Sequence, residues 1–187
     1  MKIVNQDLWA TAGNPNTVYV VTTNATLRMN GSLVMGRGAA FEAKKRYGPQ
    51  IEYSCGAKIT RLLNDEASQF VAGPNGGSSL EQGTPLPVDD AFGYDPRFYG
   101  FTHVSSIHVE GLGTEEFGIF QVKHDWWEDA KPELIQRSAL KLARIARNHP
   151  KTTFRMNFPG IGNGRLTEEQ VIQLLRDLPD NVIVCRK

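Results

Sequence analysis

Runs of β-favouring residues alternate along the chain with segments whose apolar positions recur at helical spacing. Residues 17–23 have the sequence TVYVVTT, a nearly continuous run of the kind expected for a strand covered on both faces. The pattern predicts four later strands, two of which are separated by a turn-like Gly-Leu-Gly. These strands are predicted over 100–109, 116–123, 152–156 and 181–185.

Helical patterns fill most of the intervals between these strands. Residues 39–47 predict a helix with a basic last turn, ended by the Gly-Pro pair that follows, and a second helix is predicted over 51–63. Residues 133–148 have the spacing of an amphipathic helix. Thr167 and Gln170 have the spacing of a capping box at the start of a last helix. Alternation of strands and helices predicts a layered α/β/α fold.

Composition and charge limit the classes of protein to consider. With 187 residues the chain can bury one good core, and we expect a single domain over 1–187. Residues 72–95 are rich in Gly, Pro, Ser and Asp and lack periodicity, which predicts a loop insertion. The formal charge is +1 and the basic residues are dispersed. No strong generic affinity for nucleic acid is therefore expected.

Cysteine usage and hydropathy indicate a cytoplasmic protein. The two cysteines form no CxxC pair, and the N-terminal residues lack an apolar targeting core. No apolar run approaches the length of a membrane span, so no membrane partner is expected. The four histidines are scattered. We therefore predict no metal and no cofactor.

Two glycine-rich turns, far apart in the sequence, are the strongest chemical signal. The first opens a helix and the second follows a strand. Backbone N–H groups at such turns can approach phosphate oxygens, and a helix N-terminus adds a positive dipole end. We therefore expect the turns to hold the diphosphate of a nucleotide from both sides. The residues expected to bind are Met35, Gly36, Arg37, Gly38 and Ala39 in the first turn, and Pro159, Gly160, Ile161, Gly162, Asn163 and Gly164 in the second.

Three other nucleotide or metal motifs are incomplete. In the first turn, Phe41 occupies the place of the third small residue of a dinucleotide-binding fingerprint, which argues against a Rossmann dehydrogenase. Neither turn is followed by the Lys-Ser/Thr of a Walker motif. His108 and Glu110 lack the Pro-Cys-x-x-Cys partner of a zinc deaminase, so a pair of strand residues is the better interpretation.

Taken together, the motifs resemble the macrodomain family, three-layer α/β/α modules with a central mixed sheet that bind ADP-ribose. The resemblance covers most of the chain outside 72–95. Asp7 and Leu8 are similar to the family's Gly-Asp-Ile/Leu motif, with Gln6 in place of the glycine, which implies that Asp7 binds the adenine amino group. Asn24 matches the family asparagine that contacts the distal ribose. The two glycine turns match the diphosphate and ribose loops.

Residues 120–126 (FQVKHDW) narrow the resemblance to one branch, that of the DNA ADP-ribosyl glycohydrolase antitoxins and the terminal ADP-ribose protein glycohydrolase. In that branch the lysine matched by Lys123 attacks the anomeric carbon. A neutral amine can open the ribose through a Schiff base, and desolvation or nearby cations such as Arg37 and His124 would lower its pKa. A lone lysine at a strand end can equally be a solvated charge.

The chain departs from this branch in two places. Extra residues separate Asn24 from Val34, so Asn30 is a second candidate for contact with the distal ribose. After Gly164, residues 165–167 contain no carboxylate where the protein glycohydrolase has a catalytic aspartate. The second step of the reaction therefore lacks an evident general base.

The sequence predicts an ADP-ribosyl hydrolase that releases ADP-ribose from a modified nucleic acid or protein, with Lys123, Asn24 and Asn30 as candidate catalytic residues. Two alternatives stay open, a module that binds ADP-ribose without turnover and a phosphatase acting on ADP-ribose 1″-phosphate. Asp7 can instead cap the turn that begins near Leu8. The tryptophans at 126 and 127 are interpreted as packing residues rather than a wall of the site.

Overall fold

A computed structural model describes residues 1–71 and 95–186, and within these residues the chain forms one six-stranded mixed sheet. The strand order is β1-β6-β5-β2-β4-β3, and every neighbouring pair is parallel except the β3–β4 hairpin. The strands are β1 (Lys2–Val4), β2 (Thr17–Thr23), β3 (Phe101–Val109), β4 (Gly113–Gln121), β5 (Thr153–Asn157) and β6 (Val182–Cys185).

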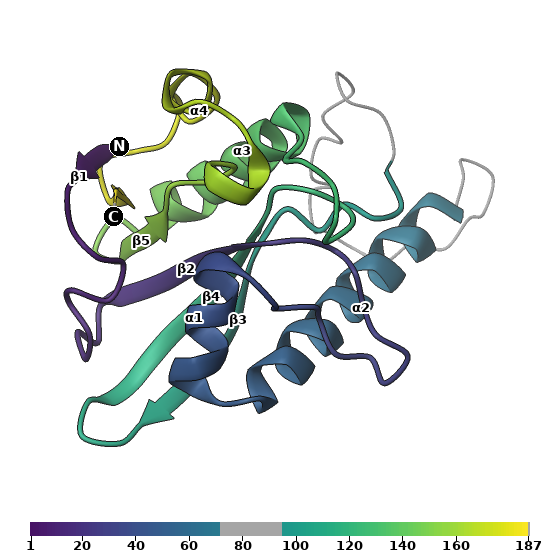
Figure 1. The fold of residues 1–187 in the computed structure, drawn as a ribbon, viewed down its shortest axis with the longest axis horizontal. Coiled ribbons are helices and arrows are strands. Elements are labelled where there is room, and N and C mark those ends of the chain that lie inside the picture. Colours follow the sequence, from purple (N-terminus) through teal and green to yellow (C-terminus); the bar gives the residue numbers. More distant parts are fainter. Residues whose placement is uncertain (72–94, 187) are drawn as a thin grey trace, which may run out of the picture.

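Helices cover both faces of the sheet (Figure 1). Helices α3 and α4 pack on one face, and α1 and α2 pack on the other. The predicted three-layer α/β/α arrangement is therefore confirmed. The helices are α1 (Gly38–Tyr47), α2 (Gln50–Val71), α3 (Pro132–Asn148) and α4 (Glu168–Leu174), with one turn of 3₁₀ helix, η1 (Gly162–Gly164).

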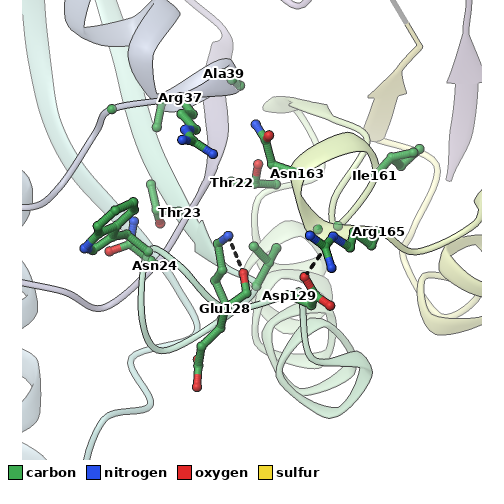
Figure 2. A pocket seen from close by; sticks show the side chains of 18 of the residues that line it. Thr22, Thr23, Asn24, Arg37, Ala39, Glu128, Asp129, Ile161, Asn163 and Arg165 are labelled. Carbon is green, nitrogen blue, oxygen red and sulfur yellow. Dashed lines mark hydrogen bonds and ion pairs between the residues drawn. The ribbon is translucent and has the colours of Figure 1, made fainter.

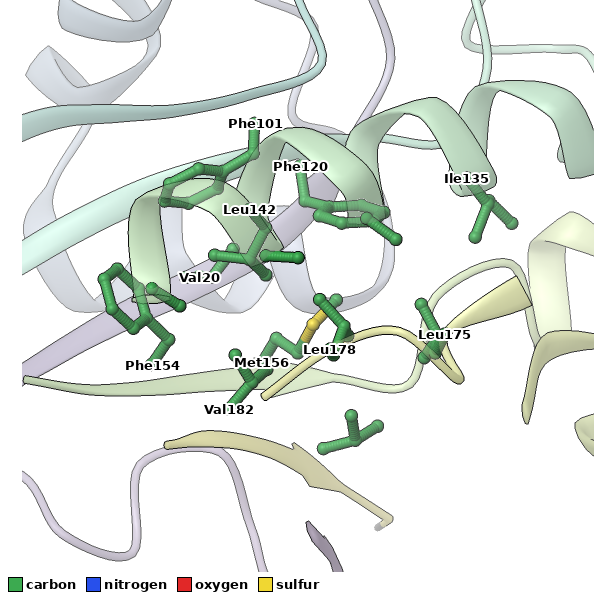
Figure 3. Close-up of a cluster of buried hydrophobic side chains, with 14 of the residues drawn as sticks. Val20, Phe101, Phe120, Ile135, Leu142, Phe154, Met156, Leu175, Leu178 and Val182 are labelled. Carbon is green, nitrogen blue, oxygen red and sulfur yellow. The ribbon is translucent and has the colours of Figure 1, made fainter. Parts of the chain in front are cut away.

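The continuous apolar run of β2 is explained by its central place between these layers. Val18 and Val20 join the apolar cluster that includes Leu142 of α3, whereas Tyr19 and Val21 join the cluster on the opposite face. Figure 3 shows Val20 and Leu142 within the first cluster. A strand buried on both faces needs apolar residues at successive positions rather than at alternate ones.

The observed element bounds follow the predicted ones closely, but β1 was not among the predicted strands, α2 is longer than predicted, and β4 is shifted toward the N-terminus and ends at Gln121 rather than at 123. The strand predicted over 17–23 and the capping box between Thr167 and Gln170 are confirmed. The helix predicted over 51–63 was too short, because residues 64–71 contain neither Gly nor Pro and α2 continues through them. Strand β4 begins earlier than the predicted 116, because the turn after β3 extends the ladder back to Gly113.

The predicted loop insertion over 72–95 lies outside the described residues, apart from Asp95. The interpretation of residues 1–187 as one domain stays a prediction. In the part of the chain that the structure describes, no helix combines the length and the apolar character that crossing a lipid bilayer requires.

Candidate functional site

A cavity of about 510 Å³ opens where β2, β4 and β5 end. These three strands are parallel neighbours, so their carboxyl ends meet at one edge of the sheet, which is the usual place for ligands in open α/β sheets. The volume lies within the range of small-molecule sites. Residues from the segments 22–24, 34–40, 122–129 and 157–165 line the cavity. Both predicted glycine turns and Lys123 therefore contribute to it.

The first glycine turn directs the N-terminus of α1 at this cavity. Gly38 has a φ of 57°, a left-handed conformation that favours glycine, and it begins the helix. Its N-cap residue, Arg37, has extended backbone and makes no capping hydrogen bond with its side chain within the described structure. Ala39 and Ala40 also line the cavity. The first N–H groups of α1 are thus suited to an anion.

The second glycine turn lies across the cavity from the first. A Cβ added at Gly38 would lie 4.0 Å from Asn163 Nδ2, which is van der Waals contact, so the two turns approach each other closely at this point. Figure 2 shows Arg37 and Ala39 facing Asn163. Gly160 and Gly164 pack closely underneath, since a Cβ on Gly164 would lie 2.8 Å from the Ala130 side chain. The arrangement fits a diphosphate held from both sides.

Lys123 follows β4 and is half-buried in the same cavity. Its Nζ donates a hydrogen bond to the backbone oxygen of Glu128 at 2.7 Å. Partial burial lowers the pKa of the Lys123 ammonium below its ordinary value, and the charge of Arg37 adds to the lowering. The carboxylates of Asp129 and Glu128 oppose it. The neutral amine is therefore more accessible here than on an exposed lysine.

The loop that carries Lys123 is fastened on two sides. Ala25 N donates to His124 O at 2.7 Å, which ties the loop to the segment after β2. Ala130 N donates to Gly164 O at 3.0 Å, which ties it to the second glycine turn. Backbone hydrogen bonds of this kind fix the position of a loop without depending on its side chains. Lys123 is thus held between the segment after β2, which carries Asn24, and the second glycine turn.

His124, expected as a neighbour of the Lys123 amine, is turned away from the cavity. It is buried, with Nε2 at 2.7 Å from Asp95 Oδ2 and Nδ1 at 3.1 Å from Lys131 Nζ. The ammonium of Lys131 can only donate, so Nδ1 accepts and Nε2–H donates to Asp95. Arg37, the other expected neighbour, does lower the pKa of Lys123.

Of the two candidate asparagines, the structure brings only Asn24 to the cavity. Its Nδ2 donates to Val34 O at 2.9 Å and its Oδ1 accepts from Thr26 N at 2.8 Å. Asn30 lies on a short hairpin and donates from Nδ2 to the Tyr53 hydroxyl at 3.1 Å, outside the cavity lining. The expectation that Asn30 could replace Asn24 is not supported, because this hairpin holds its tip away from the cavity.

Asp7 and Leu8 also lie outside the lining of this cavity. Asp7 Oδ1 accepts from Trp9 N at 2.8 Å, which is the capping interaction considered as the alternative to adenine binding. Asp7 lines a second hollow together with Arg186. Leu8 is buried in the apolar cluster beneath α1 and α2. The adenine role of Asp7 stays a prediction.

Three residues of the predicted glycine turns support the cavity without lining it. Met35 is fully buried in an apolar cluster, and Pro159 is also buried. Gly162 begins η1 with a φ of 66°. The other residues expected to bind, from both turns, line the cavity directly.

The interpretation of Trp126 and Trp127 as packing residues was wrong. They are 46% and 64% exposed, line the cavity and meet edge to face, with ring centroids 5.7 Å apart. Sequence patterns do not reveal which aromatic residues become buried when they lie in a loop. The two rings form one wall of the cavity mouth.

Sequence reasoning also missed the carboxylates of this site. Glu128 and Asp129 line the cavity, and Asp129 Oδ1 lies 3.4 Å from Nε of Arg165. The resemblance implied a carboxylate after Gly164, but the cavity receives its carboxylates from the loop after Lys123. The Glu-Asp pair shortly after the lysine is the signal that was available. Among the described residues, no cluster of three His, Cys, Asp or Glu side chains could hold a metal ion.

Comparison with known proteins gives the fold. No protein-family model and no curated protein sequence matches the chain. The macrodomain of Mycobacterium tuberculosis DarG is 18% identical, with a TM-score of 0.55, over 99% of this chain and 97% of that one. The macrodomain of Thermus aquaticus DarG is 17% identical, with a TM-score of 0.51, over 100% and 97%.

A third solved structure is Thermosipho africanus DarTG in complex with ADP-ribose. It is 17% identical with a TM-score of 0.56, and the match covers 98% of this chain and 40% of that longer chain. At these identities the similarity establishes the fold alone. The chain has the macrodomain fold that the motifs predicted.

Proposed function

We propose that the cavity binds ADP-ribose and that the protein hydrolyses an ADP-ribosyl bond. The diphosphate lies between the two glycine turns, where the uncapped N-terminus of α1 faces Asn163. The distal ribose lies over Lys123, beside Asn24. One relative with this fold was solved with ADP-ribose, which supports the choice of ligand.

The observation that carries the catalytic part is the half-buried Lys123 amine in this cavity, with its lowered pKa. The neutral amine attacks the anomeric carbon C1″ and forms a C1″–Nζ bond. The bond from C1″ to the modified group breaks, its electron pair leaves with that group, and the group takes the proton that Nζ loses. Opening of the ribose ring, with a proton from solvent going to O4″, gives an iminium between C1″ and Nζ.

Water then hydrolyses this iminium, which releases ADP-ribose and restores the lysine. The group released in the first step is a nucleic-acid base or a protein side chain. Because every step needs Lys123 but binding of the diphosphate does not, loss of the amine separates turnover from binding.

The decisive experiment compares wild type with Lys123→Ala on ADP-ribosylated DNA, ADP-ribosylated protein and ADP-ribose 1″-phosphate. We expect borohydride to trap an ADP-ribosyl adduct on Lys123 of the wild type, which mass spectrometry of peptides would locate. Lys123→Ala should lose turnover and keep its ADP-ribose affinity within a few-fold. Lys151→Ala, at an exposed lysine before β5, is the matched control and should behave as wild type.

Three outcomes would contradict the proposal in different ways. Full turnover by Lys123→Ala would exclude the lysine as nucleophile. Binding of ADP-ribose without turnover of any ADP-ribosylated substrate would identify a binding module instead. Release of phosphate from the 1″-phosphate ester alone would identify a phosphatase.

A further inference from the structure

Two carboxylates line the described part of the cavity, and the structure uses them differently. Glu128 is engaged within its own loop, since Oε2 accepts from Asp125 N at 3.0 Å and Oε1 lies 3.3 Å from Lys131 Nζ. Figure 2 shows its side chain extending away from the other labelled residues. Both oxygens of Glu128 therefore stabilise the loop.

Asp129 is placed at the junction between the Lys123 loop and the second glycine turn. Its neighbour Ala130 donates to Gly164 O, and its own Oδ1 pairs with Nε of Arg165 at 3.4 Å (Figure 2). The side chains of Asp129 and Arg165 are 57% and 77% exposed. An ion pair this exposed contributes little to stability, so it leaves the carboxylate available to water and substrate.

The backbone at Arg165 has an unusual conformation for a residue with a side chain. Arg165 has a φ of 61° and is the one non-glycine residue with positive φ in the described chain. The left-handed conformation costs a residue with a side chain roughly 1–2 kcal/mol. Arg165 follows η1 as its C-terminal cap, where the left-handed conformation is common, and its guanidinium lies next to the Asp129 carboxylate.

Asp129 also lies within the electrostatic environment of the Lys123 amine. Its negative charge is the largest single influence that raises the pKa of Lys123 against the lowering caused by burial. The carboxylate and the amine therefore act on each other across the same cavity.

Hydrolysis of the Lys123 iminium needs a proton acceptor, because water must lose a proton as its oxygen bonds to C1″. We infer that Asp129 is this general base, an inference that rests on the proposed hydrolase function. The water oxygen bonds to C1″, and the π electron pair of the C1″–Nζ double bond moves to Nζ. Asp129 takes a proton from the attacking water and passes it to Nζ. The C1″–Nζ bond then breaks with its electron pair on Nζ. Nζ thereby receives both protons of the water, and the Lys123 side chain is released from C1″ as its ammonium form.

The test uses Asp129→Asn, with Asp177→Asn as the matched control. Asp177 pairs with Arg176 at 3.9 Å, and the two side chains are 60% and 71% exposed, so the control removes a similar ion pair outside the cavity lining. For Asp129→Asn we expect release of the modified group in the first turnover, accumulation of the borohydride-trapped adduct, and a steady-state kcat roughly 10²–10⁴-fold lower. ADP-ribose affinity should stay within about threefold, and Asp177→Asn should match wild type.

The pH dependence separates catalysis from a structural role. Adduct formation should move to lower pH in the variant, because removing a nearby negative charge lowers the pKa of Lys123 further. Added formate should partly restore adduct hydrolysis.

Unchanged kcat in Asp129→Asn, or a lower kcat without accumulated adduct, would overturn the assignment of Asp129. Each of these results differs from failure of the hydrolase proposal itself, in which the wild type would yield no trapped adduct on Lys123.

Discussion

Trp127 is exposed and lies beside the cavity, so it does not have the packing role that was expected of it. It is 64% exposed beside the cavity, whereas Trp9 is packed against Tyr19 and Tyr47. An exposed indole at the mouth of the cavity offers a stacking surface to a ligand, but little free energy of unfolding depends on it.

We predict that Trp127→Phe changes the free energy of unfolding by less than about 0.5 kcal/mol. Binding of ADP-ribose should change the tryptophan fluorescence of the wild type, and most of that change should be lost in Trp127→Phe. Trp9→Phe is the control and should retain it. A fluorescence change that persists in Trp127→Phe would place this ring outside the ligand's reach.

Asp129 and Asn30 show why individual site residues were hard to predict. Asn24 matched the family motif, and Asn30 was a second candidate because extra residues separate Asn24 from Val34, but a hairpin paired between Leu27 and Leu33 keeps Asn30 outside the cavity. Asp129 belongs to no motif used in the prediction, but the loop path brings it to the cavity. Such outcomes depend on loop conformation, which local sequence specifies weakly.

At the scale of elements, the two glycine turns and the start of α1 form the part of the cavity at which we propose that the diphosphate binds. Gly38 contributes a left-handed φ, and its missing side chain leaves room in front of Asn163 of the other turn. Its place in the helix start could be predicted from sequence, because glycine before a helical pattern is a local signal. The distance across to Asn163 could not, because it depends on how β2 and β5 pair.

We predict that wild type binds ADP-ribose with a Kd in the micromolar range, a binding free energy of roughly −7 to −9 kcal/mol. Gly38→Val should weaken this binding at least tenfold. A branched side chain would enter the gap in front of Asn163 and block backbone contact with phosphate. Titration calorimetry measures the effect. AMP should bind the wild type much more weakly than ADP-ribose.

Gly111→Val is the matched control for strain alone. Gly111 also has positive φ, 76°, and open space around its Cα, but it lies in the turn between β3 and β4, outside the cavity lining. Both variants should lose similar stability, and only Gly38→Val should lose affinity. Equal affinity in the two variants would place the diphosphate elsewhere.

At the scale of the whole molecule, a buried carboxylate joins the sheet to helix α1 and to the loop between β1 and β2. Glu115 of β4 is fully buried and accepts from Arg46 at 2.6 and 2.9 Å, from the Tyr47 hydroxyl at 2.9 Å and from Gly13 N at 2.9 Å. Burial alone would raise the pKa of Glu115, but these hydrogen bonds and the charge of Arg46 hold the pKa below its ordinary value.

We predict that Glu115→Gln lowers the free energy of unfolding at pH 7 by roughly 3–5 kcal/mol, because it leaves Arg46 without its buried partner. Because the pKa of Glu115 is lower in the folded state, the stabilisation by this carboxylate is complete above the unfolded-state pKa of about 4.3. It is lost as the pH falls through the folded-state pKa. The variant should therefore depend less on pH in this acid range.

Urea denaturation at pH 7 and pH 4 checks this prediction. Glu116→Gln, at the next position and in a more exposed pair with His103, is the control and should cost about 1 kcal/mol or less. Similar losses in both variants would mean that Glu115 contributes no more than a surface pair.

The sequence by itself determined the features that depend on short stretches of chain. The doubly covered strand β2, the capping box of α4, the glycine at the start of α1 and the lysine after β4 all follow from adjacent residues and their local preferences. Local signals of this kind were sufficient to predict the α/β/α layers and the two glycine turns, whereas Lys123 and Asn24 were assigned to the site through the resemblance to macrodomains.

Only the tertiary structure decided which side chains from those segments reach the cavity. Parallel pairing of β2 with β4 and β5 gathers loops that are more than a hundred residues apart in sequence. The loops that follow these strands bring Asp129, Arg165 and the exposed Trp127 to the cavity, whereas Asn30 lies outside its lining. The physical reason is that side-chain convergence depends on backbone hydrogen bonds between distant segments, such as Ala130 to Gly164, rather than on the preferences of neighbouring residues.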